Sequence, residues 1–146
     1  MIRIGGREGE RGSALVEFAI ASSIALTLIF GIIEFGRALY TYHLVSNAAR
    51  LGSRFAMVRG SACTAAGCPA STDDVQTFVR GSAPGIATSS LAVTTSYSST
   101  ATCFSAANDP GCLVTVSVHY PFGFVVPLFP GLTLSMNSTS QMVISQ

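Results

Sequence analysis

The chain has 146 residues, of which 49% are hydrophobic and 10% charged, and its eight arginines, seven acidic residues and absent lysines leave a net charge of +1. Globular domains carry about 25% charged residues, so the composition excludes an ordinary soluble surface over the whole chain, and the lack of basic clusters excludes a nucleic-acid partner. The length fits one domain of ordinary size, and the apolar content excludes a disordered chain.

Residues 1–12, MIRIGGREGERG, form a polar leader with three arginines and two glutamates. A basic start before an apolar run also begins a secretory signal, but such a signal ends at a small-residue cleavage site. The nearest such site, Ser46-Asn47-Ala48, lies about fifteen residues beyond the apolar run, and a helical pattern continues through it. We expect a cytoplasmic leader before a membrane segment, with a secreted domain released by signal peptidase as an alternative.

An apolar run without any ionisable side chain covers residues 18–33, FAIASSIALTLIFGII. As a helix this run spans roughly 24 Å, slightly less than the hydrocarbon core of about 30 Å. Neighbouring residues extend it to Ser13 on one side and Gly36 on the other, interrupted only by Glu17 and Glu34. The sequence therefore predicts one membrane-spanning helix.

The two carboxylates in this segment differ in their neighbours. Glu34 precedes Arg37 by three residues, and a helical ion pair at the membrane surface accounts for it. Glu17 has no basic residue in the next nineteen positions, and a charge inside the membrane costs about 2.5–3.5 kcal/mol on insertion scales. Glu17 therefore lies among the lipid headgroups or has a partner outside its own segment.

Apolar residues recur at spacings of three and four beyond the span, which indicates an amphipathic helix that continues to about Val58. They are Phe35, Ala38, Leu39, Tyr42, Val45, Ala49, Gly52 and Phe55. Arg50 and Arg54 fit a solvated face, and His43 fits an amphipathic surface position better than a metal or proton site. We expect residues 13–59 to form a transmembrane and then amphipathic helix.

The remaining residues, 60–146, predict a small α+β domain. Ser71 and Asp74 have the spacing of a capping box, and the short helix that they begin ends near Gly81. Three later stretches alternate apolar and polar residues, as strands of a half-exposed antiparallel sheet do. These strands are expected at Leu91–Tyr97, Val114–Tyr120 and Leu132–Ile144. The predicted fold class is therefore α+β, with a long amino-terminal helix packed on a small antiparallel sheet.

A stretch rich in proline and aromatic residues separates the last two expected strands. Pro121, Pro127 and Pro130 are expected to confine residues 121–131, PFGFVVPLFPG, to a connection outside the strands. Its aromatic side chains can form an exposed interaction patch or fold back under the sheet, and the sequence leaves both open. His119, just before it, is expected to point away from the core.

Four cysteines, Cys63, Cys68, Cys103 and Cys112, all follow the membrane segment. An even number in a small exported domain indicates disulfides and an oxidising compartment. Three connectivities exist, and we favour the local pairs, first with second and third with fourth, because each closes a loop between elements. A zinc site is the rival interpretation, but gaps of four and eight residues do not match the usual short zinc knuckles.

No catalytic motif emerges from the sequence. The chain has two histidines and three aspartates, and it contains no nucleophile elbow, glycine-rich phosphate loop or metalloprotease motif. We expect no enzymatic activity, no cofactor, no metal and no small-molecule substrate.

The residues that end the leader, RGSALVEF at positions 11–18, resemble the processing site of type IV prepilins and pseudopilins. The helix as a whole resembles the TadE-like minor pseudopilins of tight-adherence (Flp-type) pilus systems. In such proteins a membrane-embedded prepilin peptidase cuts after the glycine, and a glutamate is the fifth residue of the mature chain. The resemblance implies a cut between Gly12 and Ser13 and a recognition or assembly role for Glu17 and the following Phe18.

The resemblance also implies a pilin-like fold and a function as a minor pseudopilin in assembly of a Flp/Tad-type pilus. The chain would cross the bacterial inner membrane once, with residues 60–146 in the periplasm. Its partners would be the membrane, the prepilin peptidase, other pilins or pseudopilins and the Tad secretion machinery. An amine newly formed at Ser13 would be the partner that Glu17 lacks. The alternative is an uncleaved single-pass anchor that carries a periplasmic binding or sensor domain.

Overall fold

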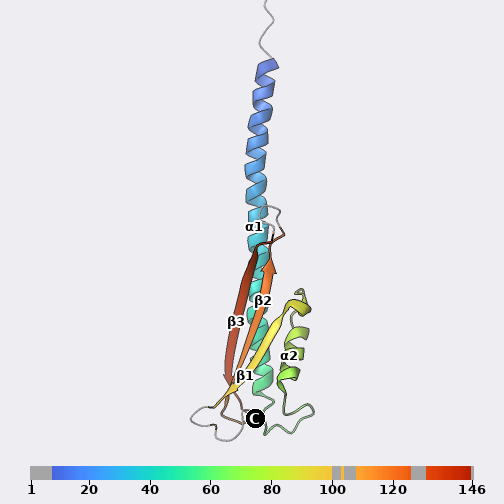
Figure 1. The fold of residues 1–146 in the computed structure, drawn as a ribbon, viewed down its shortest axis with the longest axis vertical. Helices are drawn as coiled ribbons and strands as arrows, with labels where there is room; N and C mark the ends of the chain where they lie inside the picture. Colours follow the sequence, from blue (N-terminus) through green and yellow to red (C-terminus); the bar gives the residue numbers. More distant parts are fainter. Residues whose placement is uncertain (1–7, 100–102, 104–107, 126–130, 146) are drawn as a thin grey trace, which may run out of the picture.

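The computed structural model of the chain describes residues 8–99, 103, 108–125 and 131–145. Along the chain, a long helix is followed by a short helix, a 3-10 turn and a three-stranded sheet (Figure 1). The elements are α1 Glu8–Met57, α2 Thr72–Gly81, η1 Thr88–Ser90, β1 Ala92–Ser98, β2 Leu113–Gly123 and β3 Thr133–Val143. The predicted α+β arrangement, a long amino-terminal helix with a small antiparallel sheet, is confirmed.

Helix α1 has 50 residues and contains no proline that would break its hydrogen bonds. Its first half extends away from the rest of the protein, whereas its second half lies along the sheet and beside α2 (Figure 1). The second half buries small side chains, including Val45, Ala49 and Ala56. The amphipathic pattern of this half therefore reflects packing on α2 and the sheet, which together with their loops we call the outer domain, whereas the apolar residues 18–33 of the first half remain largely exposed.

Helix α2 begins at the capping box that the sequence predicts. The backbone N–H of Asp74 donates to Ser71 Oγ at 3.2 Å, and the backbone N–H of Ser71 donates to Asp74 Oδ2 at 2.9 Å. The hydroxyl of Ser71 also donates to the same carboxylate at 2.7 Å. The hydrogen bonds from Ser71, its side chain first and its backbone second, lower the pKa of Asp74 below its ordinary value of 3.8. The cap fixes the helix start so that Val75 and Val79 face the core.

The sheet has the order β1-β2-β3, and both pairs of neighbours are antiparallel. The central strand β2 alternates strictly over its middle, with Val114, Val116 and Val118 buried. The intervening side chains point to the outer face, as a period of two requires. His119 is exposed there as expected, and its Nε2 lies 3.0 Å from Ser135 Oγ on β3.

Strand β2 continues further than the sequence predicts. It runs through Pro121 to Gly123, and these residues remain paired with β3. The last pair between β1 and β2 is Ala92 with His119, so beyond His119 strand β2 is an edge on one side, where strands tolerate proline. The expectation that all of 121–131 lies outside the strands is therefore wrong for its first three residues. Pro127 and Pro130 lie outside the described residues.

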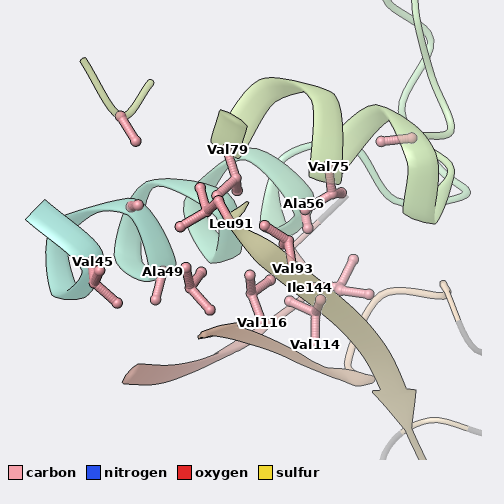
Figure 2. Packing of buried hydrophobic residues seen from close by; sticks show 14 of the residues in the cluster. Val45, Ala49, Ala56, Val75, Val79, Leu91, Val93, Val114, Val116 and Ile144 are labelled. Carbon is pink, nitrogen blue, oxygen red and sulfur yellow. The ribbon is translucent and has the colours of Figure 1, made fainter. Parts of the chain in front are cut away.

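The core lies between the inner face of the sheet and the two helices, as Figure 2 shows. Side chains from α1, α2 and all three strands or their ends meet there. The labelled examples are Val45, Ala49, Ala56, Val75, Val79, Leu91, Val93, Val114, Val116 and Ile144.

Gly52 marks the closest approach of α1 to its neighbours. A Cβ atom at this position would lie 2.5 Å from Val79 Cγ2 on α2 and 3.1 Å from Val116 Cγ1 on β2. Real side-chain carbons do not approach so closely, so α1 needs glycine here to pack against both elements.

One polar pair crosses the core between α1 and β3. The hydroxyl of Ser53, which is fully buried, donates to the carbonyl of Arg50 at 3.0 Å and lies 2.8 Å from Ser140 Oγ. Because the Ser53 proton is used by the Arg50 carbonyl, Ser140 is the donor in the second bond. The buried hydroxyl of Ser53 and the half-buried hydroxyl of Ser140 are therefore both satisfied.

Two disulfides close loops of the outer domain. Cys63 is bonded to Cys68, and Cys103 is bonded to Cys112. These are the local pairs favoured from the spacing. The carboxyl-terminal end is attached to the end of α1, because the backbone N–H of Ser145 donates to the carbonyl of Met57 at 3.1 Å.

Candidate functional site

Within the first half of α1, residues 18–33 present an apolar surface on every side. Their large side chains are exposed in the isolated chain, with Phe18 72% and Ile32 71% accessible. Among the described residues α1 is the one helix long and apolar enough to cross a membrane. A helix that is apolar all round is stable only when lipid or other protein covers it, so this half of α1 is the primary candidate interface.

The hydroxyl groups within the span are satisfied by the helix itself. Ser23 Oγ donates to the carbonyl of Ile20 at 2.8 Å, and Thr27 Oγ1 donates to the carbonyl of Ser23 at 2.8 Å. Lipid offers no hydrogen-bond partners, so these internal bonds make the two side chains compatible with the membrane interior.

The expected processing and assembly residues lie near the start of α1. Gly12, Ser13, Glu17 and Phe18 are all exposed, and the helix is continuous through them. Ser13 and Glu17 are four residues apart and so lie on one face, separated by about 6 Å along the axis. No hydrogen bond or ion pair involves the Glu17 carboxylate in the part of the chain that the structure describes.

Glu34 differs from Glu17 because it is partnered twice within the chain. The expected ion pair is present, with Arg37 Nη1 at 2.7 Å and 2.8 Å from the two carboxylate oxygens. In addition, the backbone N–H of Val125, directly after β2, donates to Glu34 Oε1 at 3.3 Å. Glu34 is only 8% exposed, so it connects the end of the span to the outer domain. The sequence did not indicate this second contact.

Aromatic residues surround the Glu34 contact. Phe122 is buried, its ring meets that of Phe124 edge to face at 5.3 Å, and the Arg37 guanidinium lies 5.3 Å from the Phe122 ring centre. An arginine over an aromatic face gains a cation–π attraction. Of the two alternatives left open for this stretch, folding back therefore holds for Phe122, which packs towards α1.

An apolar groove of about 1070 Å³ runs between α1 and the adjoining end of the hairpin formed by β2 and β3. Its helix wall includes Phe30, Phe35 and Leu39, and its hairpin wall includes Phe124 and Leu134. The groove is thus continuous with the apolar surface of the span and reaches the base of the outer domain.

The histidines and cysteines do not form a metal site within the described ranges. No group of three or more His, Cys, Asp or Glu side chains is close enough to hold a metal ion there. His43 is exposed on α1 beside Tyr42, at 6.3 Å between ring centres.

Comparison with protein families shows which known proteins this helix is similar to. The model of the TadE-like protein family matches residues 12–54. By this match the chain is TadE-like over its amino-terminal helix. No curated protein and no solved structure gave a match.

The TadE-like match begins at Gly12 and ends three residues before the end of α1. It therefore covers both the exposed span and the part of the helix that packs on the outer domain. Similarity to this family over residues 12–54 is consistent with involvement in the Tad pilus system, and the apolar helix fits a location in the membrane. The sheet, α2 and the disulfides lie outside the matched residues.

Proposed function

We propose that the chain is a minor pseudopilin that takes part in assembly of a Flp/Tad-type pilus after prepilin peptidase cuts between Gly12 and Ser13. The observation that carries the proposal is the exposed apolar segment of α1, which follows the proposed cut directly and contains one carboxylate, Glu17, without a partner among the described residues. The TadE-like match starts at the same glycine. The chain itself has no enzymatic role in this proposal and acts as a substrate and structural subunit.

The charge on Glu17 gives the proposed cut a physical consequence. An unpaired carboxylate in the membrane costs about 2.5–3.5 kcal/mol on insertion scales. The cut would create an amine at Ser13, and a neighbouring subunit could present such an amine to Glu17. The carboxylate would then be neutralised in the assembled state, which favours docking in one register.

Small residues in the span support close helix packing in lipid. They are Ala19, Ala21, Ser22, Ser23, Ala25 and Gly31. In the proposal this surface meets other pilins or pseudopilins, while residues 60–146 lie in the periplasm and contact further components of the Tad machinery.

The cleavage step is tested by co-expression with a prepilin peptidase, followed by amino-terminal sequencing and intact mass of the membrane-bound product. We expect the wild-type chain to start at Ser13 and the Gly12→Leu variant to retain its leader. Gly36→Leu is the matched control, because a Cβ at either glycine meets nothing within 4 Å. Retention of Met1 in the wild type would support the uncleaved anchor instead, and a start near Ala49 would support a secreted domain.

The assembly step is tested with Glu17→Ala. This variant should remain in the membrane and be cut normally, but it should not co-purify with sheared pili. Thr41→Ala is a control, because the hydroxyl of Thr41 donates within its own helix, to the carbonyl of Arg37 at 2.9 Å. Normal incorporation of Glu17→Ala would refute the proposed role of the carboxylate.

A further inference from the structure

The end of the β2–β3 hairpin exposes large apolar side chains. We define the hairpin tip as Phe124, Val125, Leu132 and Leu134, of which Val125 is 72%, Leu132 52% and Leu134 47% accessible. No Asp, Glu, Lys or Arg occurs from residue 110 to the last residue. Clustered exposed apolar residues without charge mark an interaction surface.

The tip is held at a defined height on α1. In Figure 1 the end of β2 and the start of β3 lie at the upper end of the outer domain, next to the part of α1 that continues into the span. The bond from the Val125 N–H to Glu34 Oε1, 3.3 Å long, places the tip level with Glu34. The backbone N–H of Phe124 also donates to the carbonyl of Leu132 at 3.3 Å, which keeps the two sides of the tip together.

Glu34 lies at the position along α1 where the edge of a membrane is expected. The distance from Ser13 to Glu34 along a helix is about 30 Å, the thickness of a hydrocarbon core. When α1 spans the membrane from Ser13, Glu34 and the attached tip lie at the boundary between acyl chains and headgroups. The remainder of the outer domain lies beyond that boundary.

The surroundings of the tip favour lipid as its occupant. The groove beside it is lined by Phe35 and Leu39 of α1 as well as Leu134, together with a few polar residues such as Ser135 and Asn137, so the tip adjoins the apolar surface of the span. Further from the tip, the exposed outer face of the sheet becomes polar, with residues such as Thr139 and Gln141. Val143 is also exposed on that face, far from the tip, but the exposed apolar side chains lie close together only at the level at which lipid would be present.

We propose that the hairpin tip is a second membrane contact, inserted into the interfacial layer of the bilayer beside α1. Apolar side chains at that depth stabilise binding in proportion to the apolar area that they bury. Together with the Glu34 bonds, the contact fixes the height and rotation of the outer domain on the membrane surface. The inference requires α1 to span the membrane, but it requires neither cleavage at Gly12 nor pilus assembly.

The chain contains no tryptophan, so a single introduced Trp reports its own environment. We would compare Val125→Trp and Leu132→Trp with Leu28→Trp, in the span, and with Gln141→Trp, on the outer sheet face. All four positions are exposed, so the larger ring does not overpack the core. Each full-length variant would be reconstituted into phosphatidylcholine–phosphatidylglycerol vesicles, with and without bromine on the acyl-chain carbons nearest the headgroup.

Both tip tryptophans should emit further to the blue than Gln141→Trp, lose fluorescence in the brominated vesicles, and resist quenching by acrylamide. Quenching of Leu28→Trp alone would overturn the tip contact. Loss of quenching at Leu28 as well would overturn it together with the membrane assignment of α1. Protection from acrylamide without quenching by bromine, relieved at higher lipid-to-protein ratio, would mean that a second copy covers the tip, and would also overturn the proposal.

Discussion

Replacement of Gly52 by alanine should destabilise the outer domain although it improves the intrinsic helix propensity of α1. The added Cβ would lie 2.5 Å from Val79 Cγ2 and 3.1 Å from Val116 Cγ1, and both valines are fully buried. Overpacking of a close-packed core costs about 1–3 kcal/mol, and contact on two sides favours the upper end. Alanine gains about 1 kcal/mol over glycine inside a helix. The free energy of unfolding should therefore fall by about 2 kcal/mol.

The measurement is urea unfolding of the full-length chain in mild detergent, followed by pulse proteolysis with the disulfides intact. Gly81→Ala is the matched control, because that glycine ends α2 with open space around its Cβ, and it should be neutral or stabilising by up to about 1 kcal/mol. The double variant Gly52→Ala with Val79→Ala should lose less stability than the two single losses added together. A Gly52→Ala chain as stable as the wild type would refute the argument.

Substitutions at three further positions test polar contacts. Glu34→Ala removes the acceptor of the Val125 N–H and the partner of Arg37 and should increase protease cleavage at the hairpin end. Glu34→Gln, which keeps an acceptor, should show a smaller increase. Ser71→Ala should lower the free energy of unfolding by about 1 kcal/mol and raise the pKa of Asp74, which is measured by carboxyl-carbon NMR. Because folding lowers this pKa, the stabilisation from the cap is present above about pH 4 and is lost as the pH falls through the pKa of the folded state. Ser53→Ala leaves Ser140 without its acceptor and should lower the unfolding free energy in urea by about 1 kcal/mol.

Local patterns in the sequence predicted most elements of the fold. The capping box at Ser71 and Asp74 predicted the start of α2, and alternation of valines predicted β2. The end of β2 was missed because a proline was taken to exclude a strand. The alternation itself continued through Tyr120 and Phe122, and that signal would have extended the strand.

The contact between Glu34 and Val125 could not be predicted in the same way. The two residues are 91 positions apart, and their proximity depends on the height at which the sheet packs on α1. That height is set in turn by close contacts such as the one between Gly52 and Val116. An amphipathic pattern shows which face of a helix is buried, but not which residue of the sheet each helix residue packs against. The pair of Glu34 with Arg37, which depends only on helical spacing, was predictable.

Glu17 and Glu34 of α1 have opposite states in the isolated chain, and this asymmetry bears on how the protein would assemble. They are separated by about 25 Å along the helix, close to the thickness of the hydrocarbon core. Glu34, at the outer boundary, is buried and bound by Arg37 and Val125, so it offers little to a partner. Glu17, about one helical turn inside the other boundary when the span begins at Ser13, is exposed and has no partner among the described residues. Under the proposed function, the energy available for a selective contact in the membrane is therefore concentrated at Glu17, while Glu34 holds the outer domain in place.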